Sequence, residues 1–132
     1  MLENIDVAAN IAVKDMNRAR SFYQDTLGLK PIDKEGDQVV VFRSGSTNIL
    51  VYKSQYAGSN KATAATWNVG EEVEGLVRTL KAKGVAFEHY DMPGTTREGD
   101  LHVSGAMKVA WFKDPDGNIL CLENGKHGPK SG

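Results

Sequence analysis

The chain has 132 residues, a formal net charge of −1 and a single cysteine. This length suits one domain, and the balanced charge does not indicate a nucleic-acid or anionic-membrane partner. Cys121 has no second cysteine for an intrachain disulfide, and no apolar run reaches the length of a membrane span. We therefore expect a soluble, cytoplasmic protein with no nucleic-acid and no membrane partner.

The first half of the chain predicts one helix followed by three strands. Residues 10–13 form a short apolar run typical of a strand, and Asp15 suits the N-cap of a helix over residues 16–26. Gly28 suits the left-handed position that ends such a helix. Three strand-like segments follow, separated by glycine-containing turns: 30–34, 38–43 and 48–53.

The second half repeats this order after about 70 residues. Residues 63–69 predict a strand, and a helix is expected from Glu71 or Glu72 to Lys83, ended by Gly84. Further strands are expected at residues 86–91, 108–113 and 119–123. The repeat indicates a duplicated half-domain, in which each copy consists of a strand, a helix and three further strands.

These elements predict a single domain over residues 1–124, built from modules at about 5–55 and 62–124. Residues 55–62 form the linker, and a flexible tail is expected over 125–132. The segment 92–107 has no clear periodicity and is expected to be a long loop. We expect it to close over a ligand, with hinges at three glycines, Gly94, Gly99 and Gly105.

Three stretches carry a resemblance to a known family: residues 15–29, 80–85 and 110–119. Together they resemble the vicinal oxygen chelate superfamily, which includes glyoxalases, bleomycin-resistance proteins and extradiol dioxygenases. The resemblance implies an α+β fold in which two βαβββ modules form cupped mixed sheets. It also implies a pocket for a small organic molecule and a homodimer. It does not fix the activity, because this fold carries lyases, isomerases, dioxygenases, transferases and non-catalytic binders.

Enzymes of this family commonly hold a divalent metal ion through the first and last strands of each module. Carried over by position, the resemblance puts these ligands at Ala8, Val51, Ala65 and Cys121. A divalent ion needs three or more oxygen, nitrogen or sulfur ligands, and one thiol does not supply them. Glu123 is the one carboxylate that could substitute on the last strand. The sequence therefore predicts no metal and no other cofactor.

The catalytic candidates are His102, His89 and Glu88. His102 is expected in the long loop, where it could act as a general base or anchor a ligand. Strand alternation places Phe87 and His89 on one face and Glu88 on the other. For each histidine, the alternative is a surface or structurally hydrogen-bonded side chain.

The ligand-binding candidates are strand and loop residues expected around the cup. Aromatic side chains there suit a planar or apolar ligand, although they equally suit an ordinary core. Cys121 could be a nucleophile, but a lone cysteine in an apolar strand is more often a small buried hydrophobe. The full set is Val51, Trp67, Trp111, Cys121, Tyr56 and Arg43.

These features favour a metal-independent small-molecule-binding protein that holds an apolar or planar ligand in the cup or in a dimer crevice. The alternative is a lyase, isomerase or dioxygenase with non-standard acid/base or metal residues. A purely structural or protein-interaction module is the third class considered. The sequence does not identify the ligand.

Overall fold

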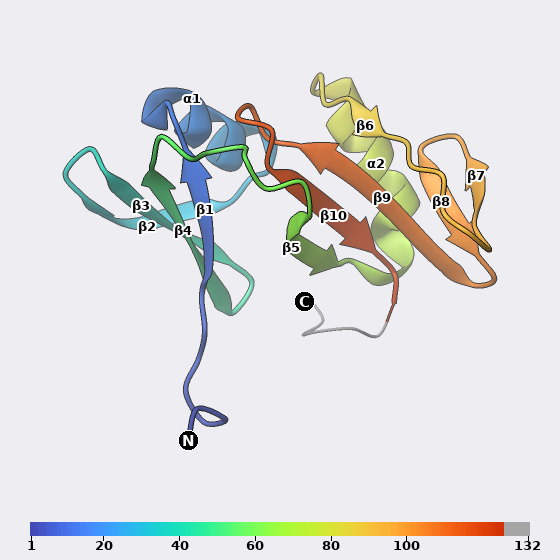
Figure 1. Ribbon diagram of the computed structural model, residues 1–132, viewed down its shortest axis with the longest axis horizontal. Helices are drawn as coiled ribbons and strands as arrows, with labels where there is room; N and C mark the ends of the chain where they lie inside the picture. Colours follow the sequence, from blue (N-terminus) through green and yellow to red (C-terminus); the bar gives the residue numbers. More distant parts are fainter. Residues whose placement is uncertain (126–132) are drawn as a thin grey trace.

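The computed structural model describes residues 1–125, apart from the side chain of Glu35, so most of the expected tail lies outside the described residues. Figure 1 shows two sheets side by side, each accompanied by one helix. No helix in this part of the chain is long and apolar enough to cross a membrane. The elements are β1 (Ala9–Val13), α1 (Met16–Arg20), η1 (Ser21–Thr26), β2 (Lys30–Glu35), β3 (Val39–Ser44), β4 (Thr47–Lys53), β5 (Thr63–Asn68), η2 (Gly70–Glu72), α2 (Val73–Ala82), β6 (Phe87–Glu88), β7 (Thr96–Glu98), β8 (Leu101–Ser104), β9 (Met107–Lys113) and β10 (Ile119–Glu123).

The first module has the strand order β1-β4-β3-β2, with β1 parallel to β4. Helices α1 and η1 follow one another without a break, so the expected helix over residues 16–26 is confirmed, with a π-helical second part. Asp15 caps it by accepting the Arg18 backbone N–H at 3.1 Å. Gly28 follows at φ +74°, the left-handed conformation that ends the helix.

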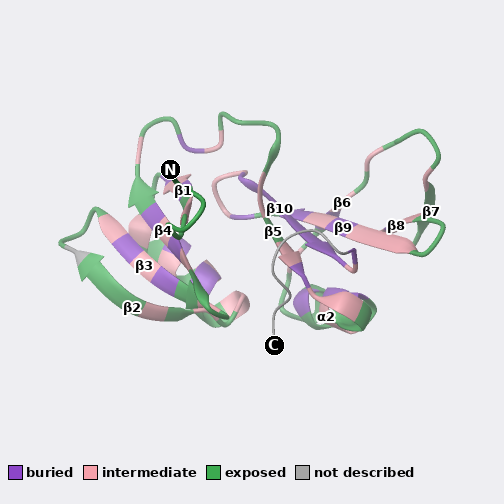
Figure 2. Cartoon of the chain, turned by 90° about the horizontal axis from the view of Figure 1, so that it is seen from below, coloured by how far each residue is buried: buried purple, intermediate pink, exposed green. Residues whose placement is uncertain are grey.

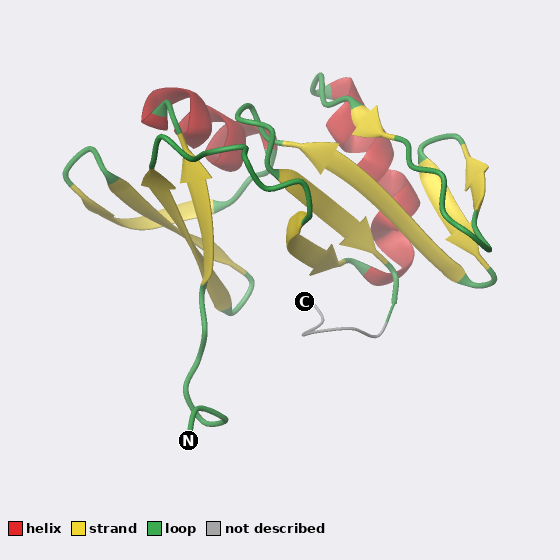
Figure 3. Ribbon diagram, in the orientation of Figure 1, coloured by secondary structure: helices red, strands yellow, loops and turns green. Residues whose placement is uncertain are grey.

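The second module has the strand order β5-β10-β9-β8-β7, and β6 also pairs with β9. The expectation of an irregular loop over 92–107 was wrong in its second half, because β7 and β8 form a hairpin there. Its turn contains Gly99 at φ +63°. Charged residues on this hairpin masked the two-residue periodicity of a strand. Strand β6 is also shorter than expected, and residues 89–95 run as an irregular loop (Figure 3).

One apolar core contains side chains from both modules. In each sheet, alternate residues point toward this core, and the others lie on the opposite face. Phe112 of β9 and Leu120 of β10 pair directly in the ladder and are fully buried on the core side of the second sheet, whereas Trp111, which precedes Phe112 and pairs with Cys121, is half-buried. This confirms two cupped mixed sheets of the βαβββ type, in which β10 is buried on both faces.

A buried polar network joins the two modules at the turn between β9 and β10. The Tyr23 hydroxyl donates to Asp114 Oδ2 at 2.8 Å, and Asn118 Nδ2 donates to the same oxygen at 2.8 Å. Asn118 Nδ2 also donates to the backbone carbonyl of Ala12, at 2.8 Å. The Asp114 carboxylate charge and burial together raise the pKa of the Tyr23 phenol, with burial the larger cause. These signature residues therefore hold the fold together.

Candidate functional site

The candidate site lies on the face of the second sheet that points away from α2. Strand register places Glu88 of β6 and Cys121 of β10 opposite Trp111 of β9. Two residues before Trp111 on β9, Val109 pairs with His102 of β8 on one side and with Glu123 of β10 on the other. Residues paired directly across a ladder share a face. We call this surface the open face and define it by Glu88, Tyr90, Arg97, His102, Val109, Trp111, Cys121 and Glu123.

Three aromatic rings form a cluster at the centre of the open face. The imidazole of His102 meets the indole of Trp111 edge to face, with ring centroids 4.8 Å apart. Tyr90 contacts the same indole edge to face at 5.3 Å and stacks beside His102 at 6.2 Å. Trp111 Nε1 donates to the Thr63 hydroxyl at 3.2 Å, which fixes the indole. The cluster offers apolar area with a few directional polar groups, the usual composition of a small-molecule site.

His102 lies in strand β8 and not in a loop, and only 2% of its surface is exposed. Its Nε2 accepts the backbone N–H of Tyr90 at 2.9 Å, so the proton of the neutral ring is on Nδ1. Nδ1 is buried and has no hydrogen-bond partner among the described residues. A buried donor without a partner is uncommon, and a ligand or an ordered water is one way to satisfy it.

Glu123 carries a second buried oxygen without a partner on the open face. Its exposed fraction is 8%, and Oε1 makes no hydrogen bond within the described part of the chain.

Burial, and then the nearby Glu123 charge, raise the pKa of the Cys121 thiol to about 12. The thiolate is therefore scarce near neutral pH, which favours a small buried hydrophobe over a nucleophile at Cys121.

Glu88 and His89 have different surroundings, since Glu88 ends β6 and His89 begins the irregular loop, with its ring 6.5 Å from that of His102. Glu88 shares the open face with Trp111 and forms an ion pair with Lys113 at 3.4 Å. His89 Nε2 bonds to Asp100 Oδ1 at 2.8 Å instead, and Lys81 of α2 reaches Oδ2 at 2.7 Å. Lys81, and then His89, lower the pKa of the Asp100 carboxyl. The structure gives His89 a partially exposed ion network that ties the β7–β8 hairpin to α2.

The remaining sequence-predicted residues do not join the open face. Val51 is fully buried in the core of the first module, so the structure does not place it in the cup. Trp67 lies at the contact between the modules and donates from Nε1 to the Ser44 hydroxyl at 2.8 Å. Tyr56 is 71% exposed in the linker. Arg43 Nε donates to Asn48 Oδ1 at 3.2 Å on the first sheet.

Three residues of the open face were absent from the sequence-based set: Tyr90, Arg97 and Val109. Tyr90 follows from the same alternation that placed Glu88, since the two are separated by one residue. Arg97 could be found only by recognising the β7–β8 hairpin, because its position opposite His102 depends on that ladder.

A cavity of about 340 Å³ lies under the irregular loop that follows β6. Figure 2 shows this loop rising from β6, on the side opposite α2, and returning to β7. The cavity is lined by Tyr90, Asp91, Met92, Pro93, Thr95, Arg97 and His102. The loop over residues 89–95 thus forms one wall of a pocket that has the buried His102 on another.

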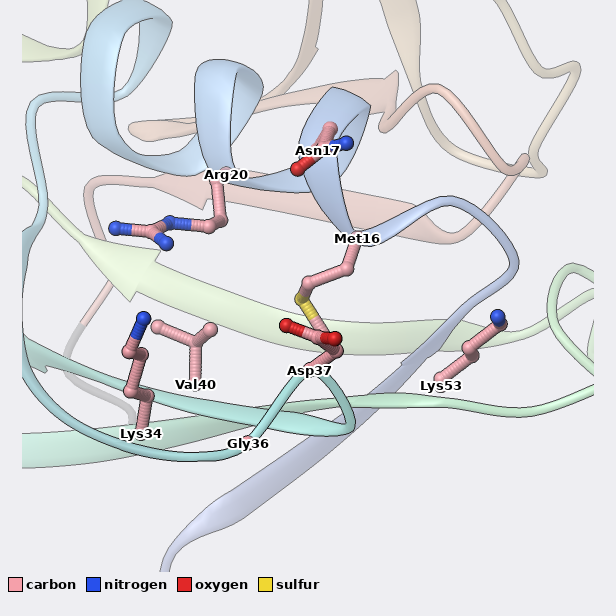
Figure 4. Close-up of a pocket in the computed structure, with 8 residues that line it drawn as sticks. All are labelled: Met16, Asn17, Arg20, Lys34, Gly36, Asp37, Val40 and Lys53. Atoms are coloured by element: carbon pink, nitrogen blue, oxygen red, sulfur yellow. The ribbon is translucent and has the colours of Figure 1, made fainter.

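A second cavity of about 290 Å³ lies in the first module, between α1 and the β2–β3 hairpin. Figure 4 shows the cations of Arg20 and Lys34 near one another, with Asp37 and Lys53 farther along. Among the described residues that line this cavity, none has a buried polar atom without a partner, in contrast to the cavity at His102. We therefore assign the candidate site to the open face.

The donor set does not fit the metal centre that the fold implies. Leu50 lies on the outward face of the first sheet opposite Val41, as Cys121 lies on the open face opposite Trp111, whereas Val51 points into the core. With Ala8 and Ala65, these positions supply one thiol among alkyl groups. Within residues 1–125, no three or more His, Cys, Asp or Glu side chains are grouped to hold a metal ion.

Comparison with solved structures finds the same fold at low sequence identity. A lactoylglutathione lyase from Agrobacterium tumefaciens is 19% identical with a TM-score of 0.68, over 93% of this chain and 95% of that one. A fosfomycin resistance protein from Listeria monocytogenes, complexed with Mn(II) and dihydroxypropylphosphonic acid, is 20% identical with a TM-score of 0.71, over 96% and 94%. A glyoxalase family protein from Enterococcus faecalis is 17% identical with a TM-score of 0.70, over 93% and 99%.

The sequence profile of one family matches residues 4–122, which is most of the chain. This match includes both modules and the signature turn at Asp114. The protein belongs to the Glyoxalase/Bleomycin resistance protein/Dioxygenase superfamily.

Proposed function

We propose that this protein binds a small organic molecule on the open face without a metal ion. The observation that carries the proposal is His102, a nearly fully buried side chain with an unpartnered Nδ1–H, beside a cavity and two aromatic rings. A planar ligand placed there gains contact area with Trp111 and Tyr90. Binding should quench or shift the fluorescence of Trp111, and Trp111→Ala should abolish that response while Trp67→Phe retains it.

Metal independence is supported by the residues at the family's ligand positions, where Ala8, Leu50 and Ala65 offer no donor atom. We expect elemental analysis of the purified protein to find no stoichiometric zinc, nickel, manganese or iron. A chelator should leave the melting temperature unchanged. One metal ion per chain, removed by chelator with loss of stability, would contradict this proposal.

The loop over residues 89–95 serves as the cover of the site in this proposal. It is a wall of the cavity and has few regular backbone hydrogen bonds. We expect hydrogen exchange at residues 92–95 to slow when ligand binds. The Tyr90 amide is an internal reference, since it already donates to His102 in the free protein. Equal exchange with and without ligand would contradict the cover.

A homodimer is the assembly that we propose. The outward face of the first sheet has an apolar strip that is incompletely buried within one chain, including Leu50 and Val41. Tyr52 on the same face is 37% exposed. Such a face is usually covered by a partner with two-fold symmetry. Light scattering should give twice the chain mass, and Leu50→Glu should give the chain mass.

Catalysis on the same face is the second candidate function. Glu88 and His102 both lie on the open face with Trp111, so an acid and a base could act on one ligand as a lyase or isomerase. Turnover that is lost in Glu88→Gln, with ligand affinity retained, would favour this function over simple binding.

A further inference from the structure

We propose that the cavity beside the β7–β8 hairpin binds the acid group of a planar carboxylic acid, through Arg97 and the Nδ1–H of His102. This inference rests on the proposed function, since it assigns a chemical class to the molecule bound on the open face. The Arg97–His102 pair is defined here as the acid anchor.

The two members of the acid anchor are direct neighbours across the hairpin. Arg97 of β7 pairs with His102 of β8 in the antiparallel ladder, and both line the same cavity. Side chains at paired positions have Cβ atoms about 4.5–5.5 Å apart. Their donor groups can therefore reach the two oxygens of one carboxylate.

Arg97 is available for a ligand. Its guanidinium forms no hydrogen bond or ion pair with any described residue, whereas Asp100, in the turn of the same hairpin, bonds to Lys81 and His89. A guanidinium binds carboxylates through two parallel hydrogen bonds, which gives geometric preference as well as attraction.

His102 supplies a donor whose orientation is already fixed. The bond from the Tyr90 amide to Nε2 holds the tautomer, and the edge contact with Trp111 holds the ring plane. The resulting Nδ1–H is buried without a partner, and a carboxylate oxygen would remove the cost of leaving it unpaired. No ligand with only apolar groups would do so.

The rest of the cavity suits a flat body rather than a second charge. Tyr90 and, from the loop, Met92 and Pro93 provide apolar area around it. One carboxylate, Asp91, also lines the cavity and would repel a bound acid. This predicts that Asp91→Asn tightens acid binding, a change that binding elsewhere on the protein would not produce.

The test uses benzoate and benzamide, which share a ring but differ in charge, with nitrogen-15 NMR of the full chain. The indole N–H signals of Trp111 and Trp67 report on the open face and on the module contact, respectively. We expect benzoate to shift the Trp111 signal and leave that of Trp67 in place, with an affinity about tenfold above that of benzamide.

Charge-matched variants complete the experiment. Arg97→Gln should remove the preference for benzoate, Asp91→Asn should increase it, and Arg20→Gln, in the other cavity, should leave it unchanged. Equal binding of both compounds at Trp111 would overturn the acid anchor and leave the proposed function standing. No shift at Trp111 with either compound would overturn both.

Discussion

The Asp114 network and the open face both contain buried polar groups, but these groups differ in their hydrogen bonding. At the turn between β9 and β10, Asp114 accepts from Tyr23, from the Asn118 side chain and from two backbone amides. On the open face, His102 Nδ1 and Glu123 Oε1 are equally buried and have no partner in the described chain. Asp116 Oδ2, in the same turn as Asp114, is also buried without a partner among the described residues, so a missing partner does not by itself mark a site. His102 differs from Asp116 because it also lines a cavity, where a ligand can reach it.

The largest effect on stability is expected from removal of the Asp114 carboxylate, which accepts four hydrogen bonds. Asp114→Ala leaves the Tyr23 hydroxyl, the Asn118 amide and two backbone N–H groups without their acceptor. We expect the free energy of unfolding to fall by about 3–5 kcal/mol in urea denaturation. Asp37→Ala, an exposed carboxylate, should change it by less than about 0.5 kcal/mol. A loss below about 1 kcal/mol for Asp114→Ala would break the comparison.

A substitution at Gly58 is expected to disturb the same turn, because the Gly58 backbone packs against that of Asp116. It has φ +75°, and an added Cβ would lie 2.0 Å from the carbonyl oxygen of Asp116. Gly58→Ala should therefore destabilise the protein by about 2–3 kcal/mol. Gly75→Ala, inside α2, meets only the flexible end of Arg78 and should stabilise it by about 0.5–1 kcal/mol. Opposite signs for the two variants, measured by thermal unfolding, are the expected result.

His102→Ala sharpens the comparison because Nε2 of His102 has a hydrogen-bond partner and Nδ1 has none among the described residues. Loss of Nε2 removes the acceptor of the Tyr90 amide and should cost about 1–2 kcal/mol of stability. Loss of Nδ1–H should cost no stability, since it has no partner, but should weaken benzoate binding about tenfold. His102→Phe keeps the packing and should show the same binding loss. Unchanged benzoate affinity in both variants would leave His102 with a structural role alone.

The smallest effect concerns the pH dependence of stability. The folded state raises the pKa of Cys121 from 9.0 to about 12. Above pH 9 the unfolded chain loses this proton first, so stability falls as pH rises. We expect a loss of about 1 kcal/mol between pH 8 and pH 10 that Cys121→Ala removes. Identical pH profiles for the two proteins would show that this thiol is not buried as described.

Periodicity predicted most of the fold, because long amphipathic patterns and helix ends depend on local residues. Asp15, Gly28 and Gly84 act at the helix ends as expected. The β7–β8 hairpin was missed because its ladder joins charged residues that carry no apolar alternation. The residue pattern within a segment does not specify which strand it pairs with.

The site was predicted only in part, for a related reason. Trp111, His102 and Cys121 share the open face, as expected of cup residues, and Glu88 lies there although His89 was expected on that side. Val51 was assigned by matching Asn48 with Asn118, but a strand position shifted by one points to the opposite face. Burial, tautomer and the absence of a partner at His102 arise only from the assembled structure.

A crystal structure of the protein grown with benzoate tests the central claim most directly. We predict ordered density for the compound between the loop over residues 89–95 and the hairpin, with its carboxylate on Arg97 and His102 Nδ1 and its ring near Trp111. Density for benzoate in the cavity between α1 and the β2–β3 hairpin, with the open face filled only by water, would contradict the account.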